Sequence, residues 1–277
     1  MILTFMILMI SAAMASAQPY RMMSWQEYSS YSHSWPYIMM IYTHEGGLLY
    51  FGVNHSHNPQ NDQFYEIDAL WKQFKPEIAF NEGNTPPLER SRNRAIRKYG
   101  EPGIVTYLAA RDHVSLESID SEPAKEVAEL GKTFRPEQLA LFYVLRQKLE
   151  YNRIPSPKPS LRDYLQGWIK SYNEVAGLNI PPSSFAELQS TYSQIFPGRG
   201  SLMNASDSSV DPTQAGSILN EISRASVEYR DQFMVAQISR AVLNGKRVFA
   251  VVGATHVVMQ ESAIRMLLTE NAPTSER

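Results

Sequence analysis

The chain has 277 residues, a formal net charge of −2 and no cysteine. This near-neutral balance argues against nucleic acid or an anionic membrane surface as a general partner. The lack of cysteine excludes thiolate nucleophiles, iron–sulfur clusters and cysteine-based zinc sites. A chain of this length can bury a sizeable core without disulfides, and we expect a single large α/β domain.

Residues 1–17, MILTFMILMISAAMASA, form an uncharged apolar run that ends in small residues. This pattern is typical of a secretory signal peptide cut before Gln18, with an uncleaved anchor as the alternative. The run is shorter than the ~20 apolar residues of a membrane span. We therefore expect an exported protein, periplasmic or extracellular, with no membrane span beyond this segment and with residues 18–277 as the domain.

After residues 18–36, which show no clear period, the first half of the chain alternates strand and helix patterns. Two strands are predicted within 37–55, around a turn at Glu45-Gly46-Gly47. Apolar residues at helical spacing then predict a helix over 63–74. The next predicted elements are a buried strand over 77–83, a charged helix over 88–100, a helix over 103–112 and a strand over 113–118.

Helical patterns dominate from about residue 122 to residue 245. The predicted helices cover 135–151, 160–177, 183–196 and 217–245, with a loop-like segment before the last. A buried strand over 246–253 then turns at Gly253 into a helix over 256–268. This order predicts a mostly parallel central sheet flanked by helices, with a helical insertion at about 122–222 that forms a lid.

Polar residues follow the predicted strands at their carboxyl ends, where ligands bind in open α/β sheets. They are Asn54, His55, His57, Asn81, Glu82, Glu117, Ser118, Thr255 and His256. Two of these ends share the pattern Gly-x-x-His, from Gly52 to His55 and from Gly253 to His256. Glycine permits a sharp turn and a close backbone approach. We expect these histidines and carboxylates to converge, with His256 kept neutral by the positive end of the helix that it begins.

Two imidazoles and a carboxylate suit a divalent metal such as manganese, cobalt or zinc. His55, His256 and Glu82 are the predicted ligands, although an ion pair with Arg230 is an alternative explanation of Glu82. A bound metal lowers the pKa of water and polarises a carbonyl, which gives hydrolysis without a covalent intermediate. The sequence contains no Gly-x-Ser-x-Gly, His-Glu-x-x-His or phosphate-binding glycine loop, consistent with this interpretation.

The paired motifs resemble the TraB/GumN/Tiki family, which belongs to a wider fold group with the erythromycin esterases and the ChaN haem-binding proteins. The resemblance lies in LLYFGVNH and PEIAFNEG, and in YRDQFMVAQISRAVLNGKRVFAVVGATH. It covers roughly 38–118 and 225–270 and says little about the helical middle. It implies a site made of His55, Glu82, Arg230, Asp231 and His256, with Glu117 as a further candidate.

The Tiki branch of this family consists of metal-dependent proteases, so the resemblance implies a metal-dependent hydrolase, such as a peptidase, that acts on a peptide or small molecule. In this prediction Glu82 activates the metal-bound water, while Arg230 and Asp231 orient the substrate. The competing predictions are a non-catalytic haem- or ligand-binding protein and a scaffold with inactive histidines. Val53, directly after Gly52, departs from the esterase and haem-binding relatives, which often have glutamate there.

Overall fold

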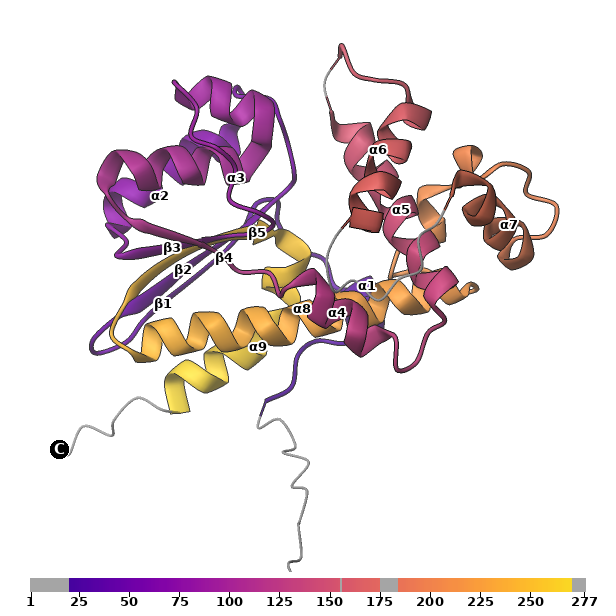
Figure 1. The fold of residues 1–277 in the computed structure, drawn as a ribbon. Helices are drawn as coiled ribbons and strands as arrows, with labels where there is room; N and C mark the ends of the chain where they lie inside the picture. The colour runs from indigo at the N-terminus through magenta and orange to yellow at the C-terminus, as the bar shows by residue number, and fades with distance from the viewer. Residues whose placement is uncertain (1–19, 155, 175–183, 271–277) are drawn as a thin grey trace, which may run out of the picture.

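The computed structural model describes residues 20–154, 156–174 and 184–270. The predicted signal peptide at 1–17 and the predicted helix end at Gly177 lie outside these residues. A five-stranded sheet in the order β1-β2-β5-β3-β4 forms the centre of the sheet part (Figure 1). The strands are β1 (Tyr37–Tyr42), β2 (Gly47–Val53), β3 (Ile78–Asn81), β4 (Ser115–Ser118) and β5 (Arg247–Gly253).

The sheet is mostly parallel, which confirms the predicted fold class. β1 pairs antiparallel with β2, whereas β2, β5, β3 and β4 pair in parallel. Every residue of β2 is buried. A strand covered on both faces needs apolar side chains in both directions, so it forms from a nearly continuous apolar run, here GLLYFGV.

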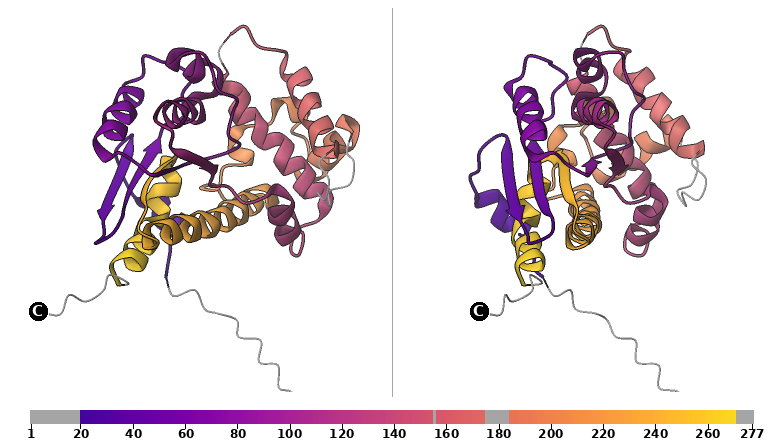
Figure 2. Two further views of the ribbon diagram at one scale, coloured as in Figure 1. Left: turned by 60° about the vertical axis from the view of Figure 1, so that its left-hand side comes forward. Right: turned by 90° about the vertical axis from the view of Figure 1, so that its left-hand side faces the viewer.

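Helices cover both faces of the sheet (Figure 2). Leu49 and Phe51 of β2 pack in one core with α2 (Asp62–Phe74) and α3 (Arg92–Asp112). Leu48 and Tyr50, which point the other way, pack with α8 (Ile218–Leu243) and α9 (Ala254–Glu270). This alternation follows from the period of two along a strand, and it clamps the central strands between two helical layers.

The two predicted helices at 88–100 and 103–112 form one helix, α3, with a kink between them. Gly100 has φ 60° and ψ −134°, and Pro102 follows inside the helix. Glycine reaches positive φ without strain, and proline lacks the N–H that a continuous helix would use. The kink carries Glu101, which directly follows Gly100.

A third core lies among the helices of the predicted insertion. These helices are α4 (Pro123–Leu130), α5 (Pro136–Arg153), α6 (Leu161–Glu174) and α7 (Phe185–Ile195). α8 contributes to two of the three cores: Leu219 and Ile222 pack with the insertion, whereas Val235 and Ile238 pack against the sheet. One long helix therefore joins the two parts of the molecule (Figure 1).

Four short elements were not predicted individually: the helices α1 (Trp25–Ser30) and α4, and the 3₁₀ turns η1 (Leu202–Asn204) and η2 (Asp207–Ser209). α1 begins with a capping box in which Ser24 and Glu27 satisfy each other's backbone N–H groups. Across the described ranges, none of the helices combines the length and apolar character needed to cross a bilayer.

Candidate functional site

The carboxyl ends of β2, β3 and β5 lie at one edge of the sheet because these strands are parallel neighbours. Val53, the last residue of β2, pairs with Gly253 of β5, and Asn81 of β3 pairs with Val251. Residues that follow the three strands therefore meet above the same edge. The side chains brought together there are those of His55, Glu82 and His256.

Glu82 lies between the two imidazoles. Its Oε1 atom is 3.5 Å from Nε2 of His256, and its Oε2 atom is 3.9 Å from Nε2 of His55. Oε1 also accepts a hydrogen bond from Nη2 of Arg230 at 2.8 Å, and Oε2 accepts one from the backbone N–H of Gly253 at 2.8 Å. The carboxylate is thus held by two further donors while both imidazole Nε2 atoms face it.

Each histidine is oriented by a second carboxylate on its other ring nitrogen. Nδ1 of His256 is 2.5 Å from Asp231 Oδ1, and Nδ1 of His55 is 3.2 Å from Glu101 Oε2. An ionised carboxylate only accepts hydrogen bonds, so we assign a proton to each Nδ1. In its neutral form, His55 then presents a bare Nε2 lone pair toward Glu82. Carboxylate–histidine pairs of this kind orient both metal ligands and acid–base histidines.

Glu101, which sequence reasoning missed, is buried at the kink of α3. Besides contacting His55, it accepts hydrogen bonds through Oε1 from the backbone N–H of Ser56 at 2.7 Å and from Nε2 of Gln63 at 3.2 Å. These contacts satisfy both of its oxygens. The local signal was the Gly-Glu-Pro break between two helical patterns, which places one carboxylate at a bend of the chain.

Asp231 is also fully enclosed, with 1% of its surface exposed. Its Oδ1 atom accepts a second hydrogen bond from Nε2 of Gln260 at 2.8 Å, and Gln260 Oε1 in turn accepts one from the hydroxyl of Tyr50 at 2.9 Å. A carboxylate enclosed in this way positions His256. It is not exposed for direct contact with a substrate.

Arg230 links Glu82 to Asp120, another carboxylate that sequence reasoning missed. Nε and Nη2 of Arg230 lie 2.9 Å and 2.6 Å from Asp120 Oδ1, and Asp120 Oδ2 accepts the backbone N–H of Gly83 at 2.8 Å. Because arginine stays charged, this buried group supplies a permanent positive charge next to Glu82.

Glu117 lies outside this cluster. It is exposed on β4, where it pairs in register with Phe80. β4 ends at Ser118, and the chain then turns so that Asp120 contacts Arg230. The search for polar residues at the carboxyl ends of strands identified the correct edge of the sheet. The carboxylate that contacts Arg230 is nevertheless that of Asp120, two residues beyond the end of β4.

The two glycines of the Gly-x-x-His motifs, Gly52 and Gly253, leave little room for a side chain, and the atoms that a Cβ would meet differ between them. A Cβ on Gly52 would lie 2.7 Å from Cα of Ala254 and 2.9 Å from the carbonyl oxygen of Tyr37, so β2 could not pass the start of α9. A Cβ on Gly253 would lie 3.0 Å from Nε2 of His55. Gly52 therefore permits backbone packing, whereas Gly253 leaves room for the imidazole itself.

The charges of the site shift several pKa values. Burial alone would raise the pKa of Glu82, but the charges of His256 and Arg230 hold it well below the ordinary value. Burial lowers the pKa of His256, yet Asp231 and Glu82 outweigh this effect and raise it to about 9. Glu82 is therefore ionised and His256 is an imidazolium at neutral pH. This direction is opposite to the neutral His256 expected from the sequence, because the carboxylates of Asp231 and Glu82 favour the charged imidazole.

The pKa of His55 is also raised above its ordinary value. Burial lowers it, but the hydrogen bond to Glu101 and the charge of Glu82 act more strongly in the opposite direction. One third of the His55 side chain is exposed, compared with 9% for His256. His55 is therefore the imidazole that solvent reaches more readily.

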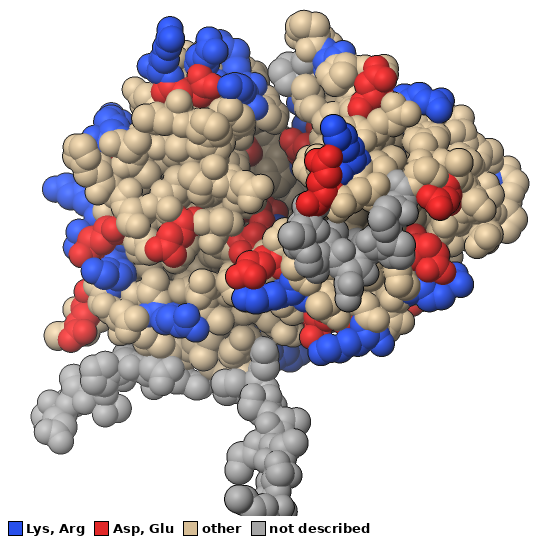
Figure 3. All heavy atoms as spheres, viewed as in Figure 1, with Lys and Arg blue, Asp and Glu red and all other residues tan. Residues whose placement is uncertain are grey.

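The helical part borders the site through α5. Oε1 of Glu150 lies 3.6 Å from Nε2 of His57, and His57 follows His55 by two residues. Figure 3 shows a hollow between the sheet part and the helical part, with acidic side chains in its depth. The site thus lies where the two parts of the molecule meet, a common position for ligand binding.

The side chains as placed do not fit a divalent metal. Within the ranges that the structure describes, no group of three or more histidine, aspartate or glutamate side chains could hold an ion. Both oxygens of Glu82 are engaged in this structure, since they accept hydrogen bonds from Arg230 and from the backbone N–H of Gly253. The predicted ligands His55, His256 and Glu82 are therefore neighbours without forming a three-ligand metal centre.

Comparison with known proteins adds no assignment to this geometry. No family model matches the chain, and no curated protein matches it. The resemblance to the TraB/GumN/Tiki family therefore remains a prediction from the motifs.

Proposed function

We propose that this chain is a hydrolase in which His55 and His256 act as an acid–base pair around Glu82. The observation that supports it is the convergence of two imidazoles, each held on Nδ1 by its own carboxylate, on one shared carboxylate. This pattern fixes the tautomer and direction of both rings, which is the requirement for proton transfer at defined atoms. The motif resemblance implies a metal-dependent hydrolase, so it agrees with this proposal in the hydrolysis reaction and differs from it in the metal.

In this proposal His55 is the general base. Its Nδ1–H is held by Glu101, its Nε2 faces the site, and it is the more exposed of the two rings. Glu82 is less suited to this role because its lowered pKa makes it a weak base. Glu82 instead supplies the negative charge that keeps the two imidazoles in place.

His256 and Arg230 carry the positive charge of the site. With a pKa of about 9, His256 is protonated at neutral pH and can donate from Nε2. It stabilises the oxyanion that forms at the attacked carbonyl and then gives its proton to the leaving group. Arg230 forms ion pairs with Glu82 and Asp120 and does not contact the substrate directly in this proposal. Its positive charge stabilises the negative charge that develops on the oxyanion.

The reaction balances for an amide or ester bond. Water attacks the carbonyl carbon and loses a proton to Nε2 of His55, which forms a tetrahedral oxyanion. The bond to the nitrogen or oxygen leaving group then breaks, and that group receives the proton of His256. Proton exchange with water returns His55 to neutral and recharges His256, so the cycle consumes one water and releases an acid and an amine or alcohol.

The decisive experiment is cleavage of a peptide library by the wild type, His55→Gln and His256→Gln. Removal of a general acid or base lowers the rate by about 10²–10⁴-fold. Glu117→Gln, at an exposed position outside the cluster, is the matched control and should cleave like the wild type. An inactive wild-type protein, or variants that cleave equally well, would contradict the proposal.

A parallel measurement separates this proposal from the predicted metal enzyme. We expect elemental analysis to find near-zero zinc, cobalt and manganese in both the wild type and His256→Gln, and we expect activity to survive a chelator. A stoichiometric metal that is lost in His256→Gln would instead establish the metal-dependent reaction.

The competing prediction of a haem carrier can be tested on the same samples. An axial histidine needs a free nitrogen in an apolar slot, whereas the Nε2 atoms of His55 and His256 face the charged Glu82. We therefore expect no Soret shift when haem is added to the wild type. A shift that disappears in His55→Ala would favour the carrier.

A further inference from the structure

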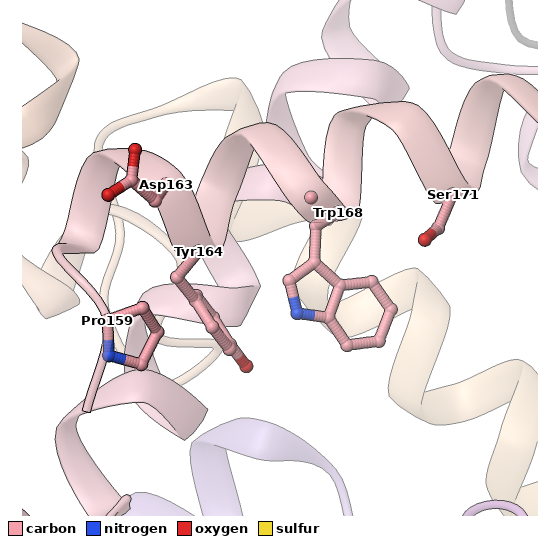
Figure 4. Close-up of a pocket in the computed structure, with 6 residues that line it drawn as sticks. Pro159, Asp163, Tyr164, Trp168 and Ser171 are labelled. Atoms are coloured by element: carbon pink, nitrogen blue, oxygen red, sulfur yellow. The ribbon is translucent and has the colours of Figure 1, made fainter. Parts of the chain in front are cut away.

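A groove of about 350 Å³ runs along the outer surface of α6, apart from Glu82. It is lined by Pro159, Asp163, Tyr164, Gly167, Trp168 and Ser171 (Figure 4). Tyr164 and Trp168 extend from the same side of the helix in this view, one turn apart. The groove therefore has two aromatic side chains along one wall.

Gly167 opens this groove, and packing does not require a glycine there. A Cβ at this position would meet no atom within 4 Å. Glycine in the middle of a helix lowers its stability relative to alanine. The residue is thus unfavourable for α6 and has no steric neighbour that explains it, but its missing side chain leaves the space between the aromatic rings and Asp163 empty.

The aromatic wall belongs to a longer series of ring contacts. Ring centroids are 5.3 Å apart for Tyr151 and Tyr164, 6.4 Å for Tyr164 and Trp168, and 5.6 Å for Trp168 and Tyr172. The ammonium group of Lys158 already lies 4.1 Å from the centre of the Tyr151 ring. The four rings therefore support one another, and the ring of Tyr151 already has a cation–π contact with Lys158.

The charge of the groove is negative. Asp163 is its one charged lining residue, and its carboxylate accepts the hydroxyl of Ser160 at 2.6 Å. Among the described residues, Asp163 has no ion-pair partner. Ammonium and guanidinium groups are attracted by both features of this groove. The aromatic rings attract them through the ring quadrupole, and the exposed carboxylate attracts them through its negative charge.

Contacts connect the groove to the catalytic end of the molecule. Tyr164 contacts Tyr151, which follows Glu150, and Glu150 lies 3.6 Å from Nε2 of His57. The groove and the site are therefore on connected walls of the helical part and the sheet part.

We propose that the groove on α6 is a subsite for a basic side chain, arginine or lysine, of a peptide substrate. This inference rests on the proposed hydrolase function for its substrate, whereas the binding that it predicts does not require catalysis. Tyr164 and Trp168 contact the stem and the face of the cationic group, Asp163 pairs with its charge, and Gly167 provides the space.

The test compares two blocked pentapeptides, one with arginine and one with citrulline at the central position, by calorimetric titration of the full-length protein. Citrulline has nearly the same shape without the charge. We expect the arginine peptide to bind about fivefold tighter, as for a solvent-exposed cation on an aromatic face with one carboxylate. The preference should disappear in Asp163→Asn, and binding of both peptides should weaken in Gly167→Leu, which fills the groove.

Gly167→Ala and His55→Gln are the controls. Gly167→Ala tests tolerance of the helix to substitution and should melt at or above the wild-type temperature. His55→Gln should bind the arginine peptide like the wild type while losing cleavage. Arginine discrimination without any cleavage would contradict only the hydrolase proposal. Equal affinity for the two peptides, or no binding of either by the wild type, would overturn the subsite.

Discussion

Nδ1 of His256 lies 2.5 Å from the carboxylate of Asp231, and both side chains are almost fully buried. The two residues come from α9 and α8, which pack side by side against the sheet. Because the carboxylate cannot donate, this contact fixes the proton on Nδ1 and directs Nε2 toward Glu82. It also contributes to the raised pKa of His256.

The first prediction concerns Asp231→Asn. The amide oxygen can still accept the Nδ1 proton, but the negative charge is lost, so the pKa of His256 should fall from about 9 toward its ordinary value. Titration of the His256 ring by NMR measures this change. Cleavage at pH 7 should drop by up to about fourfold, because roughly a quarter of His256 remains protonated once its pKa reaches ~6.5. An unchanged titration would show that Asp231 does not control His256.

The second prediction concerns Glu101→Gln. The neutral amide can keep the contact with Nδ1, but the charge that raises the pKa of His55 is removed. The low-pH limit of cleavage should therefore move to lower pH. Glu150→Gln, which alters a carboxylate paired with His57 instead, is the matched control. If Glu101→Gln and Glu150→Gln shift the low-pH limit of cleavage equally, the contact between Glu101 and His55 does not control the pKa of His55.

The third prediction is a bell-shaped pH dependence of cleavage in the wild type. Activity requires neutral His55, whose pKa is raised above its ordinary ~6.5, and protonated His256, whose pKa is about 9. The rate should rise through the His55 pKa and fall as pH passes about 9. A profile that keeps rising beyond pH 10 would contradict the role of His256 as the acid.

The fourth prediction concerns stability. The pKa of His256 is higher in the folded chain than the ordinary value of the unfolded chain, so the folded state binds its proton more tightly. Its contribution to stability is complete below about pH 6.5 and is lost as pH rises through about 9. The full shift corresponds to roughly 3 kcal/mol.

Denaturant unfolding at pH 6 and pH 10 measures this contribution. The free energy of unfolding should fall more steeply in the wild type than in His256→Gln, which lacks the titrating group. Parallel losses in the two proteins would indicate that other groups cause the pH dependence.

The fifth prediction separates the two motif glycines. In Gly52→Ala the new Cβ would press on backbone atoms at 2.7 Å and 2.9 Å, so stability should fall by about 1–3 kcal/mol. In Gly253→Ala the nearest atom is Nε2 of His55 at 3.0 Å, the end of a side chain that can move. This variant should fold with little loss but should cleave more slowly, as measured by denaturant unfolding and by rate.

The succession of strands and helices along the chain could be predicted from the sequence because it depends on local patterns, and this succession indicated a mostly parallel sheet. Apolar runs such as residues 48–53 and 248–252 are long enough to be buried strands, and segments with helical spacing separate them. Since parallel strands have their carboxyl ends at one edge, the same patterns placed His55, Glu82 and His256 near one another. α1 was missed because only six residues carry its signal, although its capping box was present in the sequence.

The amino-acid sequence by itself determined the α/β class, the mostly parallel sheet and the edge at which the two Gly-x-x-His motifs meet, because period and glycine placement act over a few residues. Only the tertiary structure decided which carboxylates reach the histidines. Glu101 arrives through a kink in α3, Asp120 lies beyond the end of β4, and Glu117 faces solvent. Such contacts depend on the packing of segments far apart in the chain, where small rotations decide which side chain is buried.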